Sequence, residues 1–106
     1  LFDQIVANAQ GFADTAAERI VALGLPVDAR LATVAAKSKP TAVPAGFTKS
    51  DAMIADVIAD MDAAIVNVQA AIDGLGEIDQ TSQDVAVEIM RGLEKDRWFL
   101  FAHISE

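Results

Sequence analysis

Apolar residues recur every three or four positions along three long stretches of the chain, which is the spacing of one face of an α-helix. The first stretch covers residues 1–23, and a glycine followed closely by a proline gives the expected stop. Residues 25–47 then form the only long connection, which holds all three prolines. Within it, residues 29–36 are predicted to form a short helix with Asp28 as the N-cap.

The second long helix is predicted to start at Thr48, because Thr48 and Asp51 stand in capping-box spacing. The third is predicted to cover residues 81–104, after a cap at Asp79 or Thr81. Only a few residues separate these two helices, so we expect them to be antiparallel neighbours.

Three helices of this length with one long crossing connection are typical of a four-helix bundle that lacks one member. The predicted fold class is therefore all-α, with three long helices and a short helix in the connection, in one domain. Their apolar stripes would leave surface exposed, so a fourth helix upstream or a partner chain is needed to cover it. Because Leu1 already lies inside a helical pattern, we expect sequence to precede it. Residues 98–102 are apolar all round and are predicted to be buried on more than one side.

The composition limits the metal sites and binding partners that this chain can have. Cysteine is absent, which excludes disulfides, zinc fingers and iron–sulfur clusters and leaves oxygen or imidazole as metal ligands. Sixteen acidic against eight basic residues give a net charge of −8, so nucleic-acid binding is not supported by these residues, whereas cations would be attracted. No apolar run approaches the roughly 20 residues that span a membrane.

Acidic side chains of the first helix fall on one narrow stripe, roughly 150° from the apolar face at 100° per residue. One interpretation is a solvated surface. The other is a metal site, since Asp14 and Glu18 are four residues apart and can share an ion. Asp3 lies eleven residues before Asp14, roughly 16 Å along the axis, which no single ion bridges. One site with all three acids would then combine Asp3 of one chain with Asp14 and Glu18 of another around a two-fold axis.

This stretch resembles the second helix of the Dps family (DNA-binding proteins from starved cells), which carries Asp, then eleven residues on D-x-x-A-E-R, then L-G. The matching residues are Asp3, Asp14-Thr-Ala-Ala-Glu18-Arg19 and Leu23-Gly24. Later segments are similar to the closing pattern of the family, namely Thr81-Ser-Gln-Asp84, Leu93-Glu-Lys and Trp98-Phe.

The resemblance implies a ferritin-like bundle that assembles into a cytoplasmic homo-dodecameric cage. Fe²⁺ would be oxidised there by hydrogen peroxide or oxygen, and Fe³⁺ mineral would be stored inside, which protects against oxidative stress. The family's ferroxidase site joins two histidines and an Asp of one subunit to an Asp and a Glu of its two-fold mate. Asp3, Asp14 and Glu18 match the three acids, as catalytic residues and metal ligands, and the histidines would lie upstream of Leu1. Arg19 is predicted to pair with Glu18 and orient its carboxylate.

A second acidic set, formed by Asp79, Asp84 and Glu88, surrounds the start of the last helix. Acids there complement the helix dipole. In the family, carboxylates at similar positions line a three-fold pore for iron uptake, and both interpretations can hold together. His103 is the only histidine, and we expect it to interact favourably with the dipole at the C-terminal end of the last helix rather than to bind metal.

Two other functions stay open. A metal held by the same carboxylates could activate water and hydrolyse an amide or ester. Alternatively, the chain is a non-enzymatic helical interaction module whose acids keep it in solution. In the family, DNA binding often depends on basic tails, and none is present in these residues.

Overall fold

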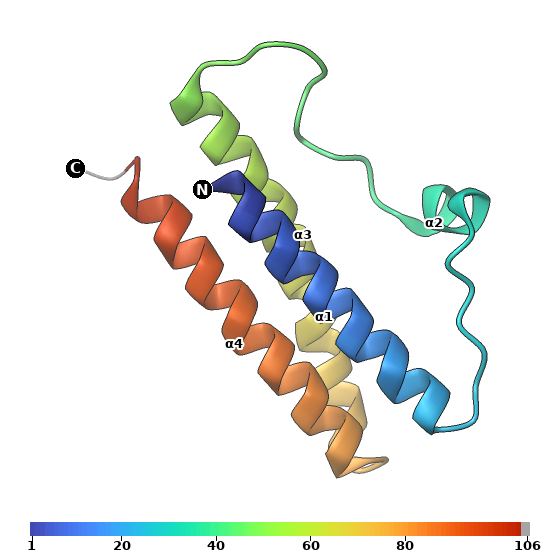
Figure 1. The fold of residues 1–106 in the computed structure, drawn as a ribbon. Coiled ribbons are helices and arrows are strands. Elements are labelled where there is room, and N and C mark those ends of the chain that lie inside the picture. The colour runs from blue at the N-terminus through green and yellow to red at the C-terminus, as the bar shows by residue number, and fades with distance from the viewer. Residues whose placement is uncertain (105–106) are drawn as a thin grey trace.

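The three apolar stripes each form a long helix, as the sequence predicts. A computed structural model describes residues 1–104 of the chain, and those residues contain helices and loops but no strand. The helices are α1 (Phe2–Ala22), α2 (Leu31–Lys37), α3 (Ser50–Leu75) and α4 (Gln80–Ala102). The all-α class is therefore confirmed, including the short helix within the connection (Figure 1).

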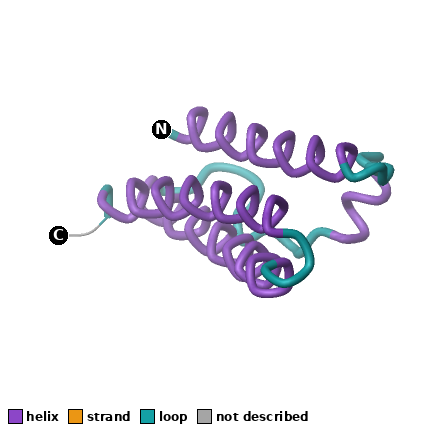
Figure 2. The backbone as a smooth tube through the Cα atoms, turned by 90° about the horizontal axis from the view of Figure 1, so that it is seen from below, coloured by secondary structure: helices purple, strands orange, loops and turns teal. Residues whose placement is uncertain are grey.

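Among the three long helices, α4 contacts both α1 and α3. A short turn joins α3 to α4, and the two run antiparallel with the most extensive contact in the described chain. The backbone of α1 approaches α4 but not α3, so α1 and α3 are diagonal members of the bundle (Figure 2). The connection crosses the length of the bundle, which leaves α1 and α3 parallel (Figure 1).

Helix ends follow local chemistry, with two corrections. α1 ends at Ala22 with Leu23 as its C-cap, and Gly24 follows with a φ of +84°, which suits a residue without a Cβ. The predicted Asp28 cap is wrong, because the carboxylate binds the side chain and backbone N–H of Arg30, and Arg30 itself is the N-cap of α2. The predicted capping box of α3 is also wrong, because Lys49 occupies the cap and accepts no N–H through its side chain.

α4, in contrast, begins as predicted. Asp79 is the N-cap and accepts hydrogen bonds from the backbone N–H groups of Thr81 and Ser82. Such a cap satisfies donors that the first turn of a helix leaves without partners.

The buried core lies at the end of the bundle where α1 and α3 begin and α4 ends. It is a cluster of apolar side chains from all three long helices: Ile5, Ile54, Ile58, Met61, Leu93 and Leu100. Leu100 is completely inaccessible to solvent. The opposite half of the bundle is open, with an apolar groove of about 370 Å³ between α1 and α3, floored by α4. The expectation that three stripes leave apolar surface uncovered is therefore confirmed.

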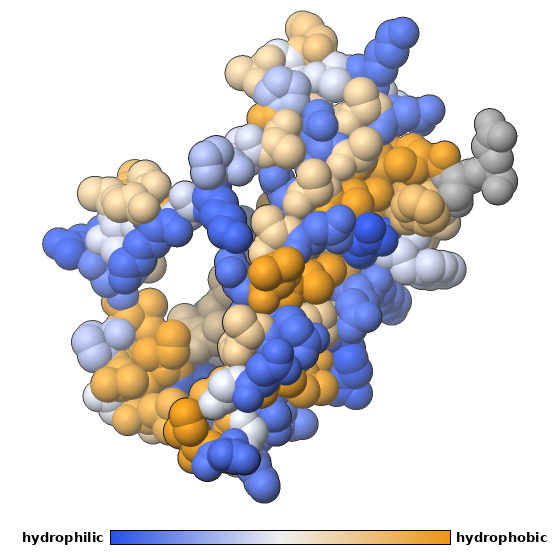
Figure 3. All heavy atoms as spheres, turned by 180° about the vertical axis from the view of Figure 1, so that it is seen from behind, coloured by the Kyte–Doolittle hydropathy of each residue, from blue (hydrophilic) through white to orange (hydrophobic). Residues whose placement is uncertain are grey.

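Aromatic residues near the end of α4 are less buried than predicted. Trp98, Phe99 and Phe101 are 64%, 47% and 49% exposed, while Leu100 between them faces the core. The prediction of burial on several sides is thus wrong for the described chain, because a helix with packing partners on one side buries only the positions that face them. Figure 3 shows exposed apolar side chains gathered in several patches on one face of the molecule, with hydrophilic side chains between them. None of the helices in residues 1–104 is long and apolar enough to cross a membrane.

Candidate metal centre on α1

The three acids that match the family site all lie on α1 with exposed side chains. Asp3 stands in the first turn, whereas Asp14 and Glu18 stand in the second half of the helix. Within residues 1–104 no group of three or more acidic, histidine or cysteine side chains is close enough to hold a metal ion. One chain therefore does not bring these acids together, which agrees with the helical spacing of roughly 16 Å between Asp3 and Asp14.

Asp14 and Glu18 border a shallow hollow on the outer side of α1. Its other lining residues are apolar and come from α1 and the start of the connection: Ala17, Val21, Ala22 and Val27. Val21 is 60% exposed and Val27 is 41% exposed. The two carboxylates thus stand beside an uncovered apolar surface, where a second chain can exclude water and supply further ligands.

Arg19 does not serve the role that the sequence predicts. Its guanidinium turns to the start of α4, where Nη2 lies 2.9 Å from Asp79 Oδ2 and Nε donates to Ser82 Oγ at 2.9 Å. The predicted pairing with Glu18 is corrected, because consecutive helical residues project about 100° apart. Glu18 therefore points outward where Arg19 points to α4.

Asp79 is the first of the predicted pore acids, and its carboxylate accepts hydrogen bonds from Arg19 and Ser82. Ser82 Oγ donates to Asp79 Oδ2 at 2.5 Å, and Arg19 donates to the same oxygen. These two donors, the Ser82 hydroxyl first, lower the pKa of Asp79 from 3.8 to about 2. Asp84 and Glu88 remain exposed on α4. The helix-start interpretation of Asp79 is thus confirmed, whereas a pore lined by Asp79, Asp84 and Glu88 stays a prediction.

The lowered pKa of Asp79 predicts a specific acid dependence of stability. A carboxyl group whose pKa is lower in the folded chain stabilises the fold above its unfolded pKa, and this contribution disappears as the pH falls through the folded pKa. Asp79→Asn keeps a cap acceptor but removes the titrating group. We expect the urea midpoint of the wild type to fall more steeply than that of Asp79→Asn between about pH 4 and about pH 2.

Asp84→Asn is the matched control for this experiment. Asp84 is exposed, and its side chain makes no ion pair or hydrogen bond with another described residue. The control should keep the steep acid dependence of the wild type. An equal fall of the urea midpoint with pH in the wild type and in Asp79→Asn would contradict the assignment of this acid dependence to Asp79.

Two further polar residues have clear positions. His103 is the C-cap of α4, and its Nδ1 lies 2.7 Å from the carbonyl oxygen of Phe99, which confirms its expected place at the helix end. Asp96 was not predicted from the sequence, although it is only 8% exposed and accepts two hydrogen bonds from the amide of Asn8. The available signal was its position four residues before Leu100, inside the apolar stripe of α4.

Comparison with known proteins decides the family. The ferritin-like domain model of the Ferritin family matches residues 1–106. The structure of Dps from Microbacterium arborescens in the high iron form matches with a TM-score of 0.94 and 62% sequence identity, over 98% of this chain and 68% of that chain. This chain belongs to the Dps branch of the ferritin-like family. The DNA protection during starvation protein of Agrobacterium fabrum is 32% identical over 108 residues, covering all of this chain and 66% of that protein.

The match to a Dps structure agrees with the observed fold, which is an all-α ferritin-like bundle. The chain spans 66% of the Agrobacterium Dps and 68% of the Microbacterium Dps. Iron storage and ferroxidase chemistry are characteristic of this family in general.

Proposed function

We propose that this chain is part of an iron-oxidising and iron-storing Dps cage. The observation that carries the proposal is the outward stripe of Asp3, Asp14 and Glu18 on α1, in the Dps pattern and beside an uncovered apolar surface. Support also comes from the 62% identity to a Dps whose structure is described as a high iron form. Carboxylate oxygens are suitable ligands for iron.

The site would form between two copies of the chain. Asp3 of one copy would bind Fe²⁺ together with Asp14 and Glu18 of its two-fold mate, so each pair of copies holds two equivalent sites. Two Fe²⁺ ions would lose one electron each, and one hydrogen peroxide molecule would take up these two electrons and two protons to form two water molecules. The carboxylates bind the substrate iron and favour Fe³⁺ over Fe²⁺ through their negative charge.

Twelve copies would enclose a cavity for ferric mineral in the cytoplasm, and symmetric copies of Asp84 and Glu88 would draw cations toward three-fold pores. The open groove between α1 and α3 would be covered by a further helix or by a partner chain. The chain has a net charge of −8, which argues against DNA binding through these residues, and DNA binding is not part of the proposal.

The direct test is Fe²⁺ oxidation by the complete protein with hydrogen peroxide or oxygen. We expect an Asp14→Ala, Glu18→Ala double variant to lose rapid oxidation while the assembly stays intact, because it lacks two iron ligands. The control is an Asp51→Ala, Asp73→Ala double variant, which removes the same charge from exposed positions on α3. This control should retain rapid Fe²⁺ oxidation.

Equal rates in the wild type and the Asp14, Glu18 variant would refute the site. Such a result would favour the interaction module if the protein also failed to bind Fe²⁺. Hydrolysis of an acyl amide that disappears on chelation would favour the hydrolase instead.

A further inference from the structure

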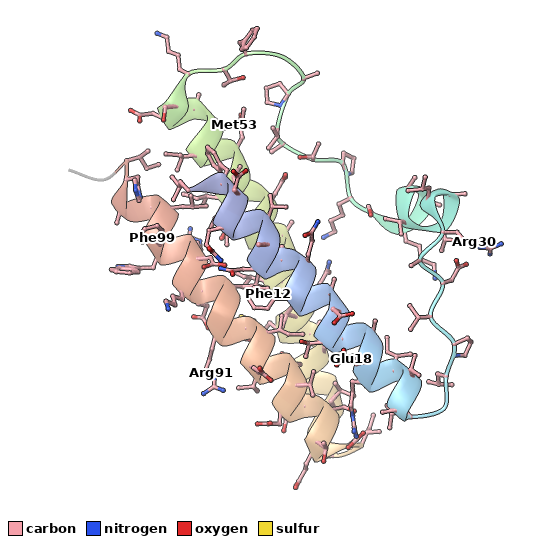
Figure 4. All side chains as sticks on the ribbon, in the orientation of Figure 1. Phe12, Glu18, Arg30, Met53, Arg91 and Phe99 are labelled. Atoms are coloured by element: carbon pink, nitrogen blue, oxygen red, sulfur yellow. The ribbon has the colours of Figure 1, made fainter. Side chains whose placement is uncertain are left out.

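Three contacts between α1 and α4 lie along one side of α1, and together they are called the contact line. At its first point, the amide of Asn8 donates to both oxygens of Asp96 at 3.1 and 3.2 Å. At the second, the ring of Phe12 lies over Gly92, so closely that a Cβ there would come within 2.3 Å of the ring (Figure 4). At the third, Arg19 binds Asp79 and Ser82.

The contact line and the acidic stripe lie on opposite sides of α1. At 100° per residue, positions 8, 12 and 19 fall within roughly 40° of one another. Asp3, Asp14 and Glu18 are centred roughly 130° away on the same geometry. The backbone of α1 approaches α4 but not α3 in the described chain, and Ile5 of α1 also packs in the apolar core. The contact line therefore acts together with this core packing to fix how α1 is rotated about its axis.

The two polar ends of the contact line make this rotation specific. Apolar packing is not directional and tolerates small rotations, whereas hydrogen bonds weaken as their angles change. Asp96 is 8% exposed, and Asn8 is its only side-chain hydrogen-bond donor among residues 1–104, so rotation would leave a buried carboxylate unpaired. The Asn8 amide is itself oriented by Gln4, which donates to its oxygen at 2.8 Å.

We propose that Asn8, Asp96, Arg19 and Asp79 are positioning residues for the metal site, which they serve by setting the rotation of α1. This inference rests on the proposed function. A carboxylate about 6 Å from the helix axis moves about 1 Å when the helix rotates by about 10°. A displacement of about 1 Å is enough to cost roughly 100-fold in rate at a catalytic site. Because two α1 helices would build each site, a rotation in both copies would displace ligands from both sides.

The test compares Arg19→Met with Arg19→Lys and with a control ion pair in the complete, assembled protein. Methionine keeps much of the side-chain volume but donates no hydrogen bond, whereas lysine keeps the charge without the planar fork. The control is Asp62→Asn, which breaks the partly exposed Arg97–Asp62 ion pair between α3 and α4 and leaves α1 untouched. Asp79→Asn is a second variant that keeps the α4 cap if Arg19→Met fails to assemble.

Anaerobic Fe²⁺ titration and amide hydrogen exchange are the two measurements. We expect Arg19→Met to weaken Fe²⁺ binding about 10- to 100-fold, Arg19→Lys to recover part of it, and Asp62→Asn to stay within about two-fold of the wild type. Exchange should accelerate in the second half of α1 in Arg19→Met and not in Asp62→Asn.

The outcomes separate this inference from the proposed function. A wild type that binds and oxidises no Fe²⁺ overturns the proposed function and the positioning role with it. A wild type that oxidises iron while Arg19→Met binds Fe²⁺ as tightly as Asp62→Asn overturns the positioning role alone. Unchanged exchange in α1 would show that Arg19 does not hold the helix, whatever the iron result.

Discussion

Subunits with Asp3→Ala and subunits with Asp14→Ala and Glu18→Ala are expected to lose iron oxidation separately and to recover part of it together. Each variant should lose at least about 100-fold, since even residues that only support metal ligands cost up to that much. In a mixed pair, one site lacks all three acids, but the other receives Asp3 from one chain and Asp14 and Glu18 from the other. Random pairing in equal amounts makes about half of the pairs mixed, so about a quarter of all sites should be restored.

The measurement is the Fe²⁺ oxidation rate after the two variants are unfolded together and reassembled. Each variant reassembled alone is the control and should remain inactive. Co-assembly without recovery would contradict a site shared between chains. Activity in the Asp3→Ala protein alone would show that Asp14 and Glu18 need no acid from a second copy.

Leu100→Ala is expected to cause the largest loss of folding stability, about 2–5 kcal/mol. Leu100 is 0% exposed, in the cluster where all three long helices meet. Truncating its side chain to alanine reduces the buried apolar surface and leaves a cavity that the neighbouring helices cannot fill completely. The measurement is the free energy of unfolding from urea titration of the complete protein.

Leu31→Ala is the control of the same chemical type. Leu31 on α2 is 89% exposed in the described chain, so we expect a change within about 0.5 kcal/mol. Equal losses for the two variants would contradict the place of Leu100 in the core. A loss confined to Leu31→Ala would instead indicate that assembly buries α2.

Local physical chemistry made much of the fold predictable from sequence. Three-and-four spacing of apolar residues identified the three long helices, Gly24 marked the end of α1, and Asp79 marked the start of α4. These features depend on residues within a few positions of one another, so they can be read without knowing the fold. The start of α3 was misjudged because Thr48 lies one residue before the true cap, and cap positions are sensitive to single-residue shifts.

The candidate site was predictable only as a pattern. The sequence by itself placed Asp3, Asp14 and Glu18 on one outward stripe of a helix and showed that one chain spreads them too far apart for one ion. It did not reveal where Arg19 points, nor that Asp96 is buried beside Asn8. Those contacts join residues 60 and 88 positions apart in the chain, and only helix packing brings them together. Tertiary structure therefore decided how α1 is held and rotated, because periodicity defines the faces of a helix but not the neighbours that each face meets.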